Sequence, residues 1–242
     1  MAVELINTTL FNDANLIHYY RFEGNSNDSK GTVNGVDTSM GYGTITGFFG
    51  QGGSFNGSSS QIAIDSAVIG SNSAYTVLGF FNGTSTQDGA VYGEGRSSTD
   101  SPFMMFRVNT GGTSGAVQYQ TRDDGDILST IDYSPGAGVL NNGSAHMYTI
   151  VKNSATSRIL YIDGTAVGTN TTNLSNPTTL DKVRFGNLSR IGTVLFYLGR
   201  ADDTATFNRA LSATEILNHW TGADIISGGV ASYKSLLGVG QA

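Results

Sequence analysis

Short runs of hydrophobic residues, many alternating with polar ones, recur along most of the chain. In one run Arg158, Leu160 and Ile162 alternate with Ile159 and Tyr161, the period of two that sends successive side chains of a strand to opposite faces. Residues with high β propensity concentrate in 16–22, 61–64, 75–81, 103–108, 116–121, 147–152, 158–162, 182–185 and 193–199. These runs predict enough strands for two sheets.

Turn signals separate the runs. Asn-Gly and Asp-Gly dipeptides supply the positive φ angles that tight hairpin turns require. They begin at Asn34, Asn56, Asn82, Asp88, Asp124, Asn142 and Asp163. Such regular punctuation predicts an antiparallel β-sandwich with few long helices.

One short helix is predicted near the C-terminal end, over residues 213–220. Ser212 can cap the amide of Glu215 while the Glu215 side chain reaches back, and Leu211 can pack on Ile216.

Composition agrees with a single large β domain. The chain has 242 residues, of which 38% are apolar and 13% charged, with 33 Gly and 3 Pro. The net charge of −6 gives no basic footprint for nucleic acid, and no apolar stretch is long enough for membrane insertion. The N-terminus lacks the features of a secretory signal, and without Cys there is no disulfide framework.

Four segments occur in an order that resembles a known family. They are 16–24 followed by Asn27-Asp28-Ser29, the glycine-rich 50–57 running into 60–62, the Tyr161–Gly164 hairpin within 160–168, and 201–216. Together they resemble the laminin-G-like jelly-roll domain of the concanavalin A-like lectin/glucanase superfamily. The resemblance implies an all-β, antiparallel jelly-roll β-sandwich over residues 16–220 with one short C-terminal helix, and a hairpin at 50–62. Residues 1–15 are then an N-terminal arm, and 221–242 a final strand, tail or attachment segment.

The family commonly binds Ca²⁺, and by position the resemblance implies Asp28 and Asp202 as ligands of a structural ion. Hard cations take carboxylate and carbonyl oxygens from irregular loops, which suits these positions. The alternative is an Asx-turn at Asp28 and a solvated strand-end carboxylate at Asp202. The acidic run 123–126 lacks the spacing of a calcium loop and is predicted to be a solvated hairpin turn.

Sugar binding is the favoured chemistry. It needs exposed aromatic rings together with polar groups that reach hydroxyls. Candidates in the middle of the chain, where the family resemblance is weakest, are Tyr92, Arg96, Tyr119, Arg122 and Tyr133. The alternative for each is packing in the core or on a sheet face.

Catalysis is not expected. The chain has four Glu and lacks the Glu-x-Asp-x-x-Glu motif of glucanases with this fold, and its three His show no triad or metal spacing. We therefore expect a non-catalytic carbohydrate-binding or adhesion module that binds a glycan or cell-surface polysaccharide. With no export signal, the expected setting is the surface of a bacteriophage particle, as a decoration or fibre protein. The alternative is a structural protein that stabilises a capsid or homo-oligomer, through contacts with virion proteins or with itself, and binds no glycan.

Overall fold

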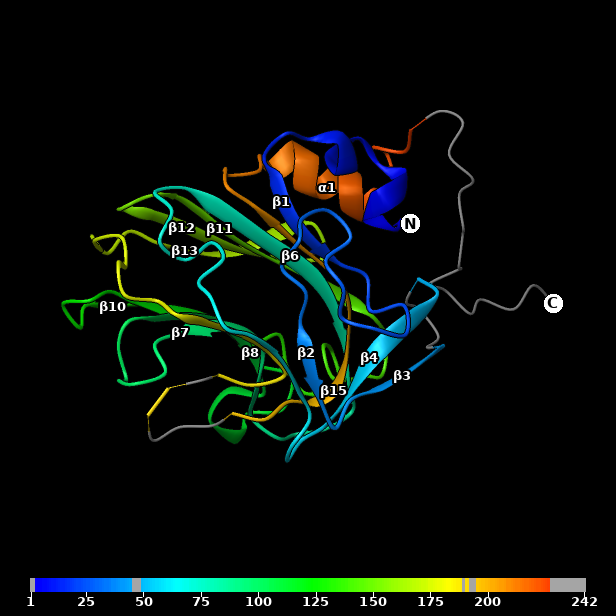
Figure 1. Ribbon diagram of the computed structural model, residues 1–242, viewed down its shortest axis with the longest axis horizontal. Helices are drawn as coiled ribbons and strands as arrows, with labels where there is room; N and C mark the ends of the chain where they lie inside the picture. Colours follow the sequence, from blue (N-terminus) through cyan, green and yellow to red (C-terminus); the bar gives the residue numbers. More distant parts are fainter. Residues whose placement is uncertain (1–2, 45–48, 189, 192–194, 227–242) are drawn as a thin grey trace.

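The computed structural model describes residues 3–44, 49–188, 190–191 and 195–226. These residues form two packed antiparallel sheets, with one short helix lying on the outside of the sandwich (Figure 1). The prediction of an all-β jelly-roll sandwich with a short C-terminal helix is confirmed.

The first sheet has eight strands. Along its main path they are β13 (Thr165–Asn170), β12 (Ser157–Ile162), β11 (His146–Ser154), β6 (Tyr75–Asn82), β15 (Leu198–Phe207), β4 (Gln51–Asn56) and β3 (Gly41–Thr44), and β1 (Leu16–Tyr20) pairs with β15 off this path. The Asp163-Gly164 turn between β12 and β13 has φ angles of 51° and 75°, as its sequence predicts.

The second sheet has seven strands. In order they are β10 (Leu128–Tyr133), β9 (Val117–Arg122), β8 (Phe103–Val108), β7 (Gly89–Gly95), β14 (Lys182–Phe185), β5 (Gln61–Ile64) and β2 (Val36–Thr38). Neighbouring strands β7 to β10 follow one another in the chain, so they form a simple meander.

Two sequence predictions about strands need correction. The β-rich run 193–199 is not a strand of its own: only 198–199 are in a strand, as the start of β15, and residues 193–194 lie outside the described residues. β15 continues to Phe207 and so contains the closing strand predicted from residue 201 onward. Segment 50–62 is not a hairpin, because β4 and β5 belong to different sheets and the Asn56-Gly57 turn carries the chain from one to the other.

The acidic run 123–126 forms the turn between β9 and β10, as predicted, but it is not simply solvated. Asp123 is buried and accepts hydrogen bonds from the amide and hydroxyl of Ser175, both at 3.0 Å. Asp124 accepts from the amide and hydroxyl of Thr178 and from the hydroxyl of Thr179. The turn therefore anchors the segment that leads into β14.

Aromatic rings fill the space between the sheets. Phe106 of β8 stacks on Tyr148 of β11 with ring centroids 4.3 Å apart, which joins one sheet to the other. Tyr20 and Tyr92 meet Phe185 edge to face at 5.1 and 5.4 Å. Such rings contribute apolar burial and favourable ring geometry together.

Helix α1 (Ala213–Thr221) covers the outer face of the eight-stranded sheet (Figure 1). Its predicted capping box is present: Ser212 accepts from the Glu215 amide, and Glu215 accepts from the Ser212 amide. Leu211 and Ile216 are buried in the same cluster, which stabilises the helix end.

The N-terminal residues pack beside this helix. Two short turns, Leu5–Asn7 and Thr9–Asn12, place Leu5 and Leu10 in the cluster beneath α1. Thr8 then pairs with Ile225, so the first and last described segments lie side by side. Of the segment predicted as a tail or attachment, residues 227–242 lie outside the described residues.

A bulge in β15 places two carboxylates inside the protein. Asp202 and Asp203 are 0% and 1% exposed, and Asp203 has a left-handed φ of 48°. Asp202 accepts from the Phe49 and Asp203 amides at 3.0 and 2.9 Å, while Asp203 accepts from the Leu5 amide at 3.2 Å and the Tyr19 hydroxyl at 2.5 Å. Burial raises the pKa of both carboxyls well above the usual range. The next largest cause is the charge of Asp203 for Asp202, and the charge of Glu4 for Asp203.

This pair should make stability fall as pH rises. Groups with a raised folded pKa contribute stability below the unfolded value, about 3.9, and lose it as pH passes through the folded pKa. Asp203→Asn cannot ionise, and its amide can accept from Leu5 while donating to Tyr19. We expect urea unfolding to show this variant gaining free energy of unfolding relative to wild type between pH 5 and 8.

Asp203→Ala is the matched control, since it strands the Leu5 amide and the Tyr19 hydroxyl. It should lose about 2–4 kcal/mol of the free energy of unfolding relative to Asp203→Asn at every pH, because both variants lack the ionisable carboxyl and only Asp203→Ala also lacks the hydrogen-bonding group. Parallel pH curves for wild type and Asp203→Asn would contradict the raised pKa.

Candidate functional site

The outer face of β8, β9 and β10 carries a set of polar side chains. Because successive residues of a strand face opposite sides, Phe106 and Tyr119 point into the sandwich while Arg107, Gln118 and Gln120 point out. The register places Arg107 opposite Gln118, and Gln118 opposite Asp132 of β10. Three neighbouring strands thus contribute one polar row across the sheet.

Hydrogen bonds hold part of this row in place. The Gln118 amide donates to Asp132 at 2.6 Å, and the Gln120 amide donates to the Thr130 hydroxyl at 3.3 Å. Each bond joins β9 to β10 on the outer face, so the glutamine side chains are oriented before any ligand arrives.

Beside this row, two guanidinium groups cover a buried aromatic ring. Phe103 lies opposite Arg122 in the β8–β9 pair. The guanidinium carbons of Arg122 and Arg190 lie 5.3 and 4.9 Å from the centroid of the Phe103 ring. Arg190 comes from the segment after β14, so it joins the site through tertiary structure.

That segment covers β7 and the Phe103 and Met105 part of β8. β7 presents small residues there, and a Cβ added at Gly93 would stand 2.8 Å from Leu188. Leu188 packs with Ala90, Phe103 and Met105 in a small buried cluster outside the sheet. The polar row on β8, β9 and β10 lies beside this cluster.

Several polar atoms on this face have no hydrogen-bond partner among the described residues, although they are buried. They include the Nε atoms of Arg107, Arg122 and Arg190 and the Oε1 atom of Gln118. A buried polar group without a partner costs about 1–3 kcal/mol, so such groups are rare in native proteins. Atoms of this kind also occur elsewhere in the described residues, for example on Thr204, Thr206 and His219; on this face they leave hydrogen-bonding capacity that water or an outside group could satisfy if the side chains shift.

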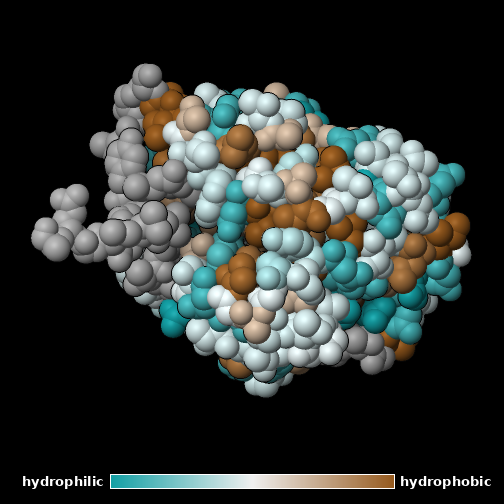
Figure 2. Space-filling view, turned by 180° about the vertical axis from the view of Figure 1, so that it is seen from behind, coloured by the Kyte–Doolittle hydropathy of each residue, from teal (hydrophilic) through white to brown (hydrophobic). Residues whose placement is uncertain are grey.

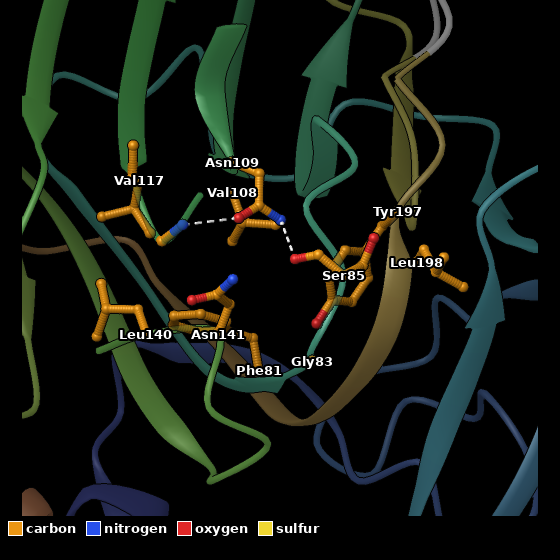
Figure 3. A pocket seen from close by; sticks show the side chains of 12 residues that line it. Phe81, Gly83, Ser85, Val108, Asn109, Val117, Leu140, Asn141, Tyr197 and Leu198 are labelled. Atoms are coloured by element: carbon orange, nitrogen blue, oxygen red, sulfur yellow. Dashed lines mark hydrogen bonds between the residues drawn. The ribbon is translucent and has the colours of Figure 1, made fainter. Parts of the chain in front are cut away.

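A pocket opens at one end of the sandwich, between the sheets (Figure 3). Phe81, Val117 and Leu140 give it apolar walls. Asn109 spans its rim, donating to the Ser85 carbonyl at 3.0 Å and accepting from the Gly115 amide. The pocket is too narrow for a sugar ring and the Asn109 amide is engaged in these bonds, so it is an end of the core rather than a ligand site.

The surface seen from behind the view of Figure 1 is mixed in character. Figure 2 shows apolar residues there in several patches that polar residues separate. A broad apolar patch would mark a protein or membrane interface, and this side does not present one. Among the described residues, no helix is long and apolar enough to cross a membrane.

The structure does not bring the five predicted sugar-binding residues together in one site. Tyr92 and Tyr119 are 0% and 1% exposed, and their hydroxyls bond inside the core, to Glu94 and to Tyr75. Neither ring can offer a face to a sugar, which removes both from the candidate set.

The other three predicted residues lie nearer the surface. Tyr133 is partly buried and packs against the core, and Arg96 lies just beyond β7. Arg122 alone belongs to the outer face just described. Phe103, Arg107, Gln118 and Arg190 were missed, although alternation within 103–108 and 117–122 carries a signal for all of them except Arg190.

The two predicted calcium ligands occupy separate environments. Both Asp28 oxygens accept hydrogen bonds: Oδ1 from the Tyr19, Lys30 and Gly31 amides, and Oδ2 from the His18 ring at 2.6 Å and the Val33 amide. Against the opposing effect of burial, these bonds hold the pKa of Asp28 at about 2.

This arrangement does not fit a calcium site. The Asp28 oxygens are taken up by donors within its own loop, and the Asp202 oxygens accept amides inside the bulge of β15. Among the described residues, no group of three or more His, Asp or Glu side chains could hold a metal ion. Calcium binding stays a prediction from the family resemblance that the geometry does not favour.

Comparison with known proteins identifies the family. Residues 56–217 match the family model described as the concanavalin A-like lectin/glucanases superfamily. The chain belongs to this superfamily. No curated protein sequence matches it.

Solved structures with the same fold include binding domains of toxins. The binding domain of Paraclostridial Mosquitocidal Protein 1 matches with a TM-score of 0.67 and 14% identity, over 86% of this chain and 52% of that one. The receptor binding domain of botulinum neurotoxin D matches with a TM-score of 0.64 and 14% identity, over 86% and 53%. The chain thus spans about half the length of these toxin domains.

A third solved structure has nearly the same length. It is domain 4 of AbnA, a GH43 extracellular arabinanase from Geobacillus stearothermophilus, in complex with arabinotriose. It matches with a TM-score of 0.64 and 15% identity, over 84% of this chain and 97% of that one. At these identities the likeness establishes the fold, and the site must be argued from this chain's own residues.

An unfolding experiment distinguishes the two roles considered for Asp28, a hydrogen-bond acceptor within its own loop and a calcium ligand. Asp28→Ala removes the acceptor of four backbone amides, so we expect a loss of about 2–4 kcal/mol in the free energy of unfolding. A chelator should leave the wild-type unfolding midpoint unchanged, because a bound ion would stabilise by mass action.

Asp65→Ala is the control, since Asp65 is an exposed carboxylate whose ion pairs with Lys182 and Arg184 contribute little. A wild-type midpoint that falls with chelator, while that of Asp28→Ala does not, would establish a calcium site at Asp28.

Proposed function

We propose that this lectin-like domain is a non-catalytic carbohydrate-binding module whose ligand lies across the outer face of β8, β9 and β10. The observation that carries the proposal is the outward row of Arg107, Gln118 and Gln120, in which Arg107 Nε and Gln118 Oε1 have no hydrogen-bond partner among the described residues. Sugars present many hydroxyls, which both donate and accept hydrogen bonds. Amide and guanidinium side chains fixed on a rigid sheet are suited to them.

The likeness to solved binding domains supports this choice. One matching structure contains arabinotriose, and others are described as receptor-binding domains of toxins. Those ligands belong to those proteins. For this chain they make a carbohydrate or a receptor protein the partner to test first, with no nucleic acid and no membrane insertion.

The positions of the four Glu residues support binding without catalysis. Glu94 lies inside the sandwich, where burial raises its pKa and the Ile69 and Gly70 amides and the Tyr92 hydroxyl bond to it. Glu4 is bonded to Arg21, Glu23 accepts from the Gln51 amide, and Glu215 caps α1. None of the four faces the candidate site, where the row contains one carboxylate, Asp132, bonded to Gln118, whereas a glycosidase needs two carboxyls on either side of one bond.

The biological setting proposed for the domain is the surface of a bacteriophage particle, as a decoration or fibre protein. Its support is a Thr-, Asn- and Gly-rich chain without Cys. Virion proteins or further copies of the chain would then be partners as well.

A glycan array covering neutral and acidic sugars, at millimolar Ca²⁺ with and without chelator, tests the proposal. We expect at least one glycan class to bind wild-type protein. The double variant Gln118→Ala/Gln120→Ala should lower that affinity about tenfold or more, because each fold-change of ten corresponds to about 1.4 kcal/mol of lost hydrogen bonding.

Gln51→Ala is the matched control, an exposed glutamine on β4 of the opposite sheet. It should bind as wild type does. A silent array would favour the alternative, a purely structural protein that stabilises a capsid or oligomer. Equal losses in the Gln51 and Gln118/Gln120 variants would move the site away from this face.

A further inference from the structure

Four arginines donate side-chain hydrogen bonds within the chain, and five, namely Arg96 beyond β7, Arg200 of β15 and three on the candidate face, donate none to a described residue. Arg21, Arg158, Arg184 and Arg209 donate hydrogen bonds within the chain. Arg107, Arg122 and Arg190 are half-buried on the outer face of the seven-stranded sheet, yet none donates a hydrogen bond to a described residue. A guanidinium group has five N–H donors, so this cluster holds a large unused capacity.

Only weak ion pairs offset their charge. Arg107 lies 3.6 Å from Asp88, and Arg122 lies 3.9 Å from Asp126, both beyond hydrogen-bond length. The Asp126 side chain is 76% exposed, so its pair with Arg122 contributes little. Asp88 and Asp126 pair with two of the arginines and Asp132 lies in the same row, so what this face offers an outside group is the unused N–H donors of the three guanidinium groups rather than a surplus of positive charge.

Two of the three guanidinium groups share one aromatic ring, and the third lies further along the same strand. Arg122 and Arg190 both contact the Phe103 ring, and Arg107 follows Phe103 and Met105 on the same side of β8. Burial, offset in part by Asp100, lowers the pKa of Arg190, and the charges of Arg122 and Arg107 lower it further. Like charges kept together on a folded surface repel, and an anion bound between them would relieve that repulsion.

We propose that the ligand of this face is an acidic polysaccharide whose carboxylate or sulfate groups are bound by Arg107, Arg122 and Arg190. The inference rests on the proposed carbohydrate-binding function and names the class of sugar. Carboxylate and sulfate both match the planar fork of a guanidinium group, which can donate two parallel hydrogen bonds. Gln118, beside Arg107 in the same row, would bind neighbouring hydroxyls.

The overall charge of the chain makes this a local effect. With a net charge of −6, the protein has no general attraction for polyanions. Binding must therefore come from the arginine cluster, and should be sensitive to salt because the cluster is only half-buried.

The test compares three polymers by calorimetry at low and high NaCl: polygalacturonate for carboxylate, dextran sulfate for sulfate, and dextran as the neutral control. Wild-type protein should bind one or both acidic polymers and bind dextran at least tenfold more weakly. Arg107→Gln, Arg122→Gln and Arg190→Gln should each lower the acidic affinity about fivefold or more. Carboxylate and sulfate are distinguished by which polymer binds more tightly per charge.

Arg200→Gln is the matched control, since it removes the same charge from β15 in the other sheet. It should bind as wild type does. Unfolding midpoints show whether each variant folds, and Arg→Lys variants, which keep the charge and lose the fork, should show an intermediate affinity.

Several outcomes would overturn the inference. Equal losses in Arg200→Gln and the three face variants would indicate general ion exchange. Wild-type binding to neutral glycans through Gln118 and Gln120, with none to either acidic polymer, would leave the carbohydrate-binding function standing and reject the acidic ligand. Absence of binding to every neutral and acidic glycan would reject both.

Discussion

The buried pair Asp202 and Asp203 is the constraint on which the arrangement of the first sheet depends. β15 pairs with β6 along one edge, and its other edge is shared by β4 before the bulge and β1 after it. The change of partner needs a break in the strand, and the break brings two carboxylates into the interior. Amides of Phe49 and Leu5 and the Tyr19 hydroxyl satisfy them, so distant segments are tied to one point.

Much of the fold could be predicted from local pattern because local and tertiary preferences agree. Strands β5, β8 and β14 lie at the predicted bounds, and the capping box of α1 forms as its sequence indicates. β7 was missed because Gly89, Gly93 and Gly95 give it low strand propensity. Pairing with β8 on one side and β14 on the other supplies what propensity does not.

The candidate site was predictable only in part, and the reason lies in strand geometry. Tyr119 and Arg122 were placed in one ligand site, but they are three positions apart on β9 and so face opposite sides of the sheet. The aromatic residue went to the core, and the polar ones went out. Arg190 could not have been found from pattern, because it reaches Phe103 from a loop far along the chain.

The pairing of Thr8 with Ile225 has a consequence for how the domain can be carried. Both segments lie in the layer beside α1, on the outside of the eight-stranded sheet, while the arginines lie on the outside of the seven-stranded one. The two faces are separated by the full thickness of the sandwich. A scaffold that contacts the layer beside α1 would therefore lie on the opposite side of the sandwich from the arginines.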